Sequence, residues 1–191
     1  MEFLPRVIDG RLSRWLRGQP AVRLEGPRGC GKTTTALQHA GSAVHLDAHP
    51  GMTELAQLDP DRILTGTAPH LVDEWRLAPS LWPQITSRLG DQPLPGRYLL
   101  ASSATPLEYR HRTREAAQLP VLRMRTMTLS ERLGVEAPVS LAGLAYGDRV
   151  TGIRSPLSYA QLAEHAVHGG WPELLDADTD AAISYNASYL H

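Results

Sequence analysis

A glycine-rich stretch constrains the fold of this 191-residue chain more than any other feature. Residues 26–33 read GPRGCGKT and follow the spacing G-x-x-x-x-G-K-[ST]. The alternating, β-rich residues 21–25 predict a strand before it, and residues 32–40 predict a helix after it, with Gly41 placed to end that helix. A strand, a glycine loop and a helix in this order indicate a phosphate-binding loop, in which backbone N–H groups turn toward an anion.

Lys32 is the only lysine in the chain, against 18 arginines. A phosphate loop needs a compact ammonium group on a flexible stem, and the larger planar guanidinium of arginine is not equivalent. We predict that Lys32 contacts the β- and γ-phosphates of a nucleotide and that the Thr33 hydroxyl is a ligand of Mg²⁺. The alternative is a glycine-rich turn that only precedes a helix. The predicted nucleotide-binding residues of the loop are Gly26, Pro27, Arg28, Gly29, Cys30, Gly31, Lys32, Thr33 and Thr34.

Two adjacent carboxylates follow about forty residues after the loop. Asp73 and Glu74 close the segment PHLVDE, an apolar strand with an acidic tip, which has the form of a Walker B element. Asp73 would hold Mg²⁺, usually through water. Glu74 would polarise the attacking water as a general base, a role that contributes roughly 10²–10⁴ in rate, so Glu74 and Lys32 are the predicted catalytic residues. The alternative is a solvated acid pair that opens a helix, where acids interact favourably with the helix dipole.

A third polar group ends the next predicted strand, residues 96–104. Ser103 is the main candidate, with Ser102 and Thr105 as its neighbours. A polar side chain at this strand end would contact the γ-phosphate or the attacking water, so Ser103 is also a predicted nucleotide-binding residue. The alternative is a strand-end turn or a helix cap.

Several arginines and the single cysteine are further candidates for functional residues. Arg123 and Arg125 share one face of the last predicted strand, near the expected phosphates. Cys30 lies inside the loop beside Lys32. We interpret it as a small loop residue rather than a nucleophile, and we predict that its thiol is alkylated at neutral pH and protected by Mg²⁺·ATP. We interpret three other arginines as residues of a solvated loop, with an arginine finger or a nucleic-acid patch as the alternatives: Arg110, Arg112 and Arg114.

Strand-like and helix-like segments alternate along most of the chain. The predicted strands cover residues 21–25, 43–47, 70–75, 96–104 and 119–127. The predicted helices cover residues 11–18, 32–40, 52–58 and 79–90. This alternation favours an α/β fold, a P-loop NTPase with a doubly wound and mainly parallel sheet. The later residues are helical in pattern, so we expect a P-loop core over residues 1–137 and a small helical segment over residues 138–191.

The composition limits the partners and the location of the protein. The net charge is −1, so nucleic acid is not indicated as a partner. One cysteine excludes an internal disulfide and fits a cytoplasmic location. No apolar run approaches the roughly 18 residues that span a bilayer, and the first residues do not have the pattern of a signal peptide. A protein partner or a homo-oligomer stays open.

The choice of nucleotide follows from the single lysine. The usual guanine motif N-K-x-D needs a second lysine, so we predict ATP rather than GTP. The acidic pair favours Mg²⁺-dependent ATP binding and hydrolysis. One alternative is a small-molecule P-loop kinase, in which residues 110–114, RHRTR, would form a lid. The other is a nucleotide-binding or interaction module that does not hydrolyse ATP.

The chain resembles the prokaryotic AAA-type ATPases that carry a C-terminal domain of unknown function. The shared motifs are LPRVID, GPRGCGKTTTA, LDA, LVDEW, RYLLASSATP, LRMRTMTLSE and GGWPE, and together they span nearly the whole chain. The resemblance implies that residues 26–34 bind ATP, that Asp73 and Glu74 form the Walker B pair and that Ser103 is the sensor residue.

Three departures accompany this resemblance. Family members tend to have LTGSA where this chain has LASSA at residues 100–104, and a glutamine where it has Arg76. They also continue through a winged-helix-like segment into a substantial C-terminal domain. We therefore expect this chain to be the ATPase half alone, with low activity in isolation. The final helix has an apolar face that we expect to pack on another domain or another copy, formed by Ala182, Tyr185 and Tyr189.

Overall fold

The computed structural model describes residues 3–91, 93–103, 119–136, 139–152 and 154–190. It divides into two compact units, and each has its own internal contacts. The sheet unit consists of Val7–Arg125, and the helical unit consists of Met1–Arg6 together with Thr126–His191. The predicted boundary after residue 137 follows a change in sequence pattern, and it stays a prediction about domain organisation.

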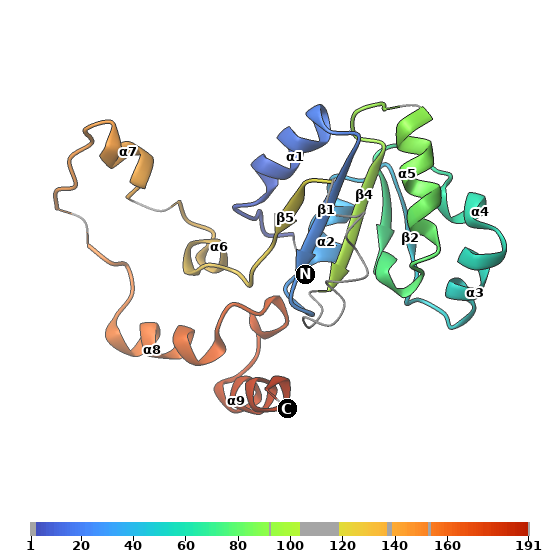
Figure 1. Cartoon of the computed structure of the whole chain (residues 1–191). Helices are drawn as coiled ribbons and strands as arrows, with labels where there is room; N and C mark the ends of the chain where they lie inside the picture. Colours follow the sequence, from blue (N-terminus) through green and yellow to red (C-terminus); the bar gives the residue numbers. More distant parts are fainter. Residues whose placement is uncertain (1–2, 92, 104–118, 137–138, 153, 191) are drawn as a thin grey trace. The chain divides into compact units, whose positions relative to one another are not determined.

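Five parallel strands form the sheet of the sheet unit, in the order β2-β3-β4-β1-β5 (Figure 1). Parallel neighbours need crossover connections, which helices usually supply. The structure therefore confirms the predicted α/β fold with a parallel sheet. The strands are β1 (Ala21–Gly26), β2 (Ser42–His45), β3 (His70–Asp73), β4 (Tyr98–Ser103) and β5 (Val121–Arg123).

Helices pack on both faces of this sheet, as a doubly wound fold requires. Side chains of a strand alternate between the two faces. Ala21 of β1 belongs to a buried cluster with Leu81 and Ile85 of α5, whereas Val22 and Leu24 are buried outside that cluster, and α1 and α2 both contact β1. The helices of the sheet unit are α1 (Asp9–Gly18), α2 (Lys32–Leu37), α3 (Gly51–Leu58), α4 (Pro60–Leu64), the 3₁₀ turn η1 (Trp75–Leu77) and α5 (Leu81–Asp91).

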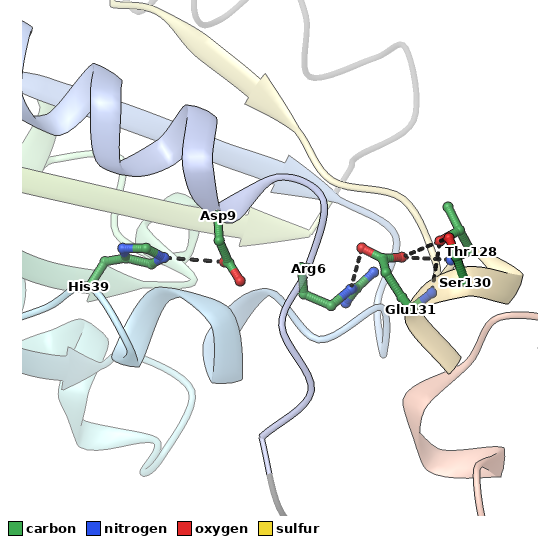
Figure 2. Close-up of polar contacts among 6 residues, drawn as sticks. All are labelled: Arg6, Asp9, His39, Thr128, Ser130 and Glu131. Atoms are coloured by element: carbon green, nitrogen blue, oxygen red, sulfur yellow. Dashed lines mark hydrogen bonds and ion pairs between the residues drawn. The ribbon is translucent and has the colours of Figure 1, made fainter. Parts of the chain in front are cut away.

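The helix after the glycine loop is shorter than the sequence predicts. It ends at Leu37, ahead of the expected stop at Gly41. The following turn is attached to α1, because His39 Nε2 lies 3.2 Å from Asp9 Oδ1 (Figure 2) and His39 Nδ1 lies 3.3 Å from Ser13 Oγ. A tertiary contact therefore replaces the last predicted helical turn.

Further elements differ from the prediction, and the predicted strands 43–47 and 70–75 already end at His45 and at Asp73. The predicted strand 119–127 is ladder-paired over Val121–Arg123 alone, where β5 pairs with β1 at the edge of the sheet that the described residues form. The helix α4 was not predicted, although its start has a recognisable signal: the side chain of Asp59 accepts a hydrogen bond from Arg62 N at 3.2 Å, and Pro60 follows the cap.

The α-helices described in the helical unit begin at side-chain caps, whereas its 3₁₀ turn over Pro172–Leu174 has no side-chain cap. Thr128 and Ser158 each form a reciprocal capping box, with Glu131 and Gln161 respectively. Among the described residues, no helix of either unit combines the length and the apolar composition needed to cross a bilayer. The elements are α6 (Leu129–Leu133), α7 (Leu141–Ala145), α8 (Tyr159–His168), η4 (Pro172–Leu174) and α9 (Thr179–Tyr189).

A buried ion pair joins the two sequence segments of the helical unit. Arg6 Nε donates to Glu131 Oε1 at 3.2 Å, and the two side chains are 6% and 8% exposed. The other carboxylate oxygen of Glu131 accepts from the backbone N–H of Thr128 at 2.6 Å (Figure 2). Glu131 thus caps α6 and holds Arg6 at once, and it connects the motifs LPRVID and LRMRTMTLSE, which are far apart in the sequence.

The apolar face of the final helix is partly covered within the same unit. The ring of Trp171 lies 4.3 Å from that of Tyr189 and 6.1 Å from that of Tyr185, centroid to centroid. The indole N–H of Trp171 donates to Asn186 Oδ1 at 3.0 Å, and Ala182 is fully buried. The two tyrosines therefore have a partner in the motif GGWPE, which the sequence argument missed.

Candidate functional site

The candidate site lies at the carboxyl ends of the strands, where parallel α/β sheets commonly bind ligands. The register of the sheet aligns these ends: Gly26 of β1 pairs with Ser103 of β4, and His45 of β2 pairs with Asp73 of β3. Because β4 lies between β1 and β3, its last residue stands between the glycine loop and the acidic pair. The predicted residues are thereby brought together from segments far apart in the sequence.

The glycine loop adopts a backbone that only glycine adopts readily. Gly29 and Gly31 have positive φ angles of 78° and 95°. At Gly26, a Cβ atom would overlap the carbonyl oxygen of Met124 and lie 3.0 Å from Cys30 Sγ. The spacing of glycines in the motif therefore has a steric cause at each of these positions.

Lys32 is a buried cation with uncharged partners. The residue is 5% exposed. Its ammonium group donates to the carbonyl of Pro27 at 3.0 Å and to the hydroxyl of Ser103 at 3.3 Å. Among the described residues, no carboxylate forms an ion pair with it. Since burying a charge without a counter-charge is unfavourable, this arrangement favours an anion as its partner.

Asp73 is the last residue of β3, and its carboxylate is buried. Its side chain is 3% exposed. The Thr33 hydroxyl donates to Asp73 Oδ2 at 2.7 Å, and the backbone N–H of Glu74 donates to Asp73 Oδ1 at 3.2 Å. The two residues predicted to bind a metal are therefore in direct contact. Hydroxyl and carboxylate oxygens are the ligands that Mg²⁺ prefers, so the chemistry of this pair fits that ion.

Glu74 is held in an unusual backbone conformation. Its φ and ψ are 49° and 39°, and it is the only non-glycine residue with a positive φ in the described part of the chain. Left-handed backbone costs roughly 1–2 kcal/mol for such a residue. The conformation directs the carboxylate toward Ser103, whose hydroxyl donates to Oε1 at 2.6 Å and whose backbone N–H donates to Oε2 at 3.0 Å. Strain of this kind is common at functional sites.

The predicted reactivity of Cys30 is not supported. Its side chain is completely buried, so an alkylating reagent has no access to it in this conformation. The thiol instead fills space beneath the loop, next to Gly26. The nearby charge of Lys32 suggested a reactive thiol, but the packing of the loop keeps reagents away from it.

The remaining predicted residues differ in position. Arg28 and Thr34 are exposed on the loop and on α2. Ser102 is buried, and its hydroxyl has no hydrogen-bond partner among the described residues. Arg123 and Arg125 are exposed at the edge strand and just after it. The candidates that lie outside the described residues are Thr105, Arg110, Arg112 and Arg114.

Two features of the site were missed by sequence reasoning. His45 Nδ1 lies 3.1 Å from Asp73 Oδ2. Glu25 of β1 accepts hydrogen bonds from both Arg23 and Arg76, the latter at 2.7 Å. His45 lies inside the predicted strand 43–47, and its place beside the acidic pair depends on where β2 ends and on its register with β3. The described residues contain no group of three or more His, Cys, Asp or Glu side chains arranged to hold a metal.

The sheet, the glycine loop after β1 and the acidic end of β3 together define a P-loop NTPase fold. No protein-family profile matches the chain. Two curated proteins are similar to part of it: the uncharacterized proteins Rv2008c of Mycobacterium tuberculosis and Mb2031c of Mycobacterium bovis. Each is 33% identical over 104 residues, which is 53% of this chain and 24% of the relative. The chain therefore spans about a quarter of the length of these relatives.

Among solved structures, that of C. elegans PCH-2 is similar to this chain. The match has 15% sequence identity and a TM-score of 0.36, and it covers 66% of this chain and 42% of the other. At this TM-score the similarity carries no argument about function. The assignment of the fold depends on the strand order and the loop described above.

Proposed function

We propose that this chain binds Mg²⁺·ATP at the glycine loop and hydrolyses it. The observation that carries the proposal is the buried ammonium of Lys32, which has only uncharged partners among the described residues. A bound phosphate would supply the missing negative charge and accept hydrogen bonds from the loop. The choice of ATP over GTP rests on the lack of a second lysine for the guanine motif, and the proposed kinship with AAA-type ATPases rests on the shared motifs.

In this proposal, Thr33 and Asp73 hold Mg²⁺. The bound ion would offset the negative charge of the phosphates. In the 2.7 Å hydrogen bond between the two side chains, the Thr33 hydroxyl points its hydrogen toward Asp73, so the lone pairs of the Thr33 oxygen are directed away from Asp73. Both groups then present oxygen atoms to the same region of the site.

Glu74 is the proposed general base, and Ser103 controls its position. The serine hydroxyl donates to Glu74 and accepts from Lys32, so it links the base to the phosphate-binding cation. A phosphate that binds Lys32 competes for this hydroxyl and changes the hydrogen bonding of Glu74. This gives Ser103 a defined part as the sensor residue.

A second function, nucleotide binding without hydrolysis, is favoured by one observation. Both carboxylate oxygens of Glu74 are bonded to Ser103, which leaves the base engaged before any ligand arrives. For Glu74 to act as the base, these hydrogen bonds would have to be exchanged for one to the attacking water, and such rearrangement is common when substrate binds. The kinase alternative depends on residues 110–114, which lie outside the described part of the chain.

The test separates binding from turnover. ATP and GTP are each titrated into the protein by calorimetry, once with Mg²⁺ and once with EDTA. Phosphate release is then measured with ATP as the only nucleotide. We expect ATP binding that Mg²⁺ strengthens, no comparable binding of GTP, and phosphate release. Binding without phosphate release would support the second function, and no binding of either nucleotide would refute both.

A further inference from the structure

His45 contacts the proposed Mg²⁺ ligand Asp73, and its place is set by the sheet. The two residues are register partners at the carboxyl ends of β2 and β3. Their side chains meet with 3.1 Å between His45 Nδ1 and Asp73 Oδ2, and they are 36% and 3% exposed. A partly exposed imidazole therefore covers one side of a buried carboxylate.

The chemistry of this contact defines which atom carries the proton. An ionised carboxylate only accepts hydrogen bonds, so His45 Nδ1 must carry a hydrogen to bond to it. Asp73 then receives three donors: the hydroxyl of Thr33 on α2, the ring of His45 on β2 and the backbone N–H of Glu74, the next residue in the chain. Donors on both oxygens prevent the carboxylate from rotating.

We propose that His45 is a positioning residue that holds the carboxylate of Asp73 in the orientation that binds Mg²⁺, an inference that rests on the function proposed above. Without the imidazole, Oδ2 keeps only the bond from Thr33, and the carboxylate turns more freely. Groups that orient a metal ligand in this way typically change metal affinity by about 10–100-fold when they are removed.

Three variants separate the hydrogen bond from the bulk of the ring. His45→Leu keeps a side chain of similar size and removes the donor. His45→Asn restores an N–H donor at the position closest to Nδ1. His49→Leu is the matched control, because His49 is exposed in the segment after β2. If the ring of His45 only filled space, His45→Asn would not stay closer to the parent than His45→Leu.

The first measurement needs neither metal nor nucleotide. The nitrogen NMR shifts of the His45 ring report which nitrogen carries the hydrogen. We expect a hydrogen on Nδ1 in the parent protein at neutral pH. A ring with its only hydrogen on Nε2 would overturn the proposal, because Nδ1 would then be unable to donate to Asp73.

The second measurement is a Mg²⁺ titration at fixed ATP, followed by calorimetry in EDTA. We expect His45→Leu to raise the half-saturating Mg²⁺ concentration about 10-fold or more, with ATP affinity in EDTA unchanged. His45→Asn and His49→Leu should stay close to the parent. An unchanged Mg²⁺ requirement in His45→Leu, or equal defects in the leucine and asparagine variants, overturns this inference alone. A parent protein that binds no ATP refutes the proposed function itself.

Discussion

The sheet unit and the helical unit are stabilised in different ways. In the sheet unit, leucines such as Leu24 and Leu99 are completely buried, whereas in the helical unit Leu141, Tyr146 and Tyr159 are 86%, 92% and 93% exposed. Each Å² of buried apolar surface contributes about 25 cal/mol. The sheet unit therefore depends mainly on its core, and the helical unit depends more on helix caps and the Arg6–Glu131 pair.

This difference shows why the candidate chemistry gathers in one unit. The side chains of the site belong to the ends of strands, to the turn after β3 or to the start of α2 after the glycine loop, and the packed sheet fixes the strand ends. Units with few buried contacts tend to open locally at low free-energy cost. Variants of the site should therefore change binding and turnover, whereas variants of the helical unit should change local opening.

The largest expected effect is on turnover, from Glu74→Gln. The amide keeps the shape of the side chain and removes the base, so phosphate release should fall roughly 10²–10⁴-fold. Mg²⁺·ATP affinity should stay near that of the parent. Glu54→Gln on the exposed face of α3 is the control and should release phosphate normally. Unchanged phosphate release by Glu74→Gln would show that Glu74 is not the base.

The next effect is on binding, from Lys32→Ala. Removing a buried charged partner of a ligand costs about 2 kcal/mol or more, which is roughly 30-fold or more in ATP affinity. The thermal unfolding midpoint should equal or exceed that of the parent, because the variant removes a buried charge without a counter-charge. Calorimetry and thermal scans test both, with Gln38→Ala at the end of α2 as the control. Retained ATP affinity would contradict the proposed function.

The sequence predicts the parts of the site that are local and misses those that depend on register. Residues 26–33 and the pair Asp73–Glu74 carry their signals within a few residues, so their positions, following β1 and ending β3, can be predicted from local sequence. The contact of His45 with Asp73 depends on the pairing of β2 with β3. The Arg6–Glu131 pair joins residues 125 positions apart, and no local pattern contains it.

A third effect concerns the stability of the sheet unit, from Gly26→Ala. The added methyl group overlaps the carbonyl of Met124 and crowds Cys30, so the loop must shift. Overpacking of this kind costs about 1–3 kcal/mol, and ATP affinity should fall with it. Gly51→Ala is the control, because nothing lies within 4 Å of its Cβ position. Denaturant unfolding should separate the two variants, and equal stability would show that the loop tolerates a side chain.

The smallest effect should fall in the helical unit alone, from Thr128→Ala. The Thr128 hydroxyl accepts from the backbone N–H of Glu131 at 3.2 Å and also lies 3.1 Å from Glu131 Oε2. The substitution removes the half of the capping box that the Thr128 side chain supplies, which should lower the stability of α6 by about 1 kcal/mol. Ser140→Ala is the control, because that cap on α7 has a single bond, to Gly143 N at 3.3 Å.

Hydrogen exchange measures this difference unit by unit. In Thr128→Ala, amides of α6 should exchange about 5-fold faster, which corresponds to 1 kcal/mol, while amides of β1 and β4 keep the parent's rates. The carboxylate of Glu131 retains its bonds to Arg6 and to the Thr128 backbone, so α6 should loosen without separating from Arg6. Faster exchange in the sheet strands as well would show that the two units are stabilised together, which would remove the contrast drawn between them.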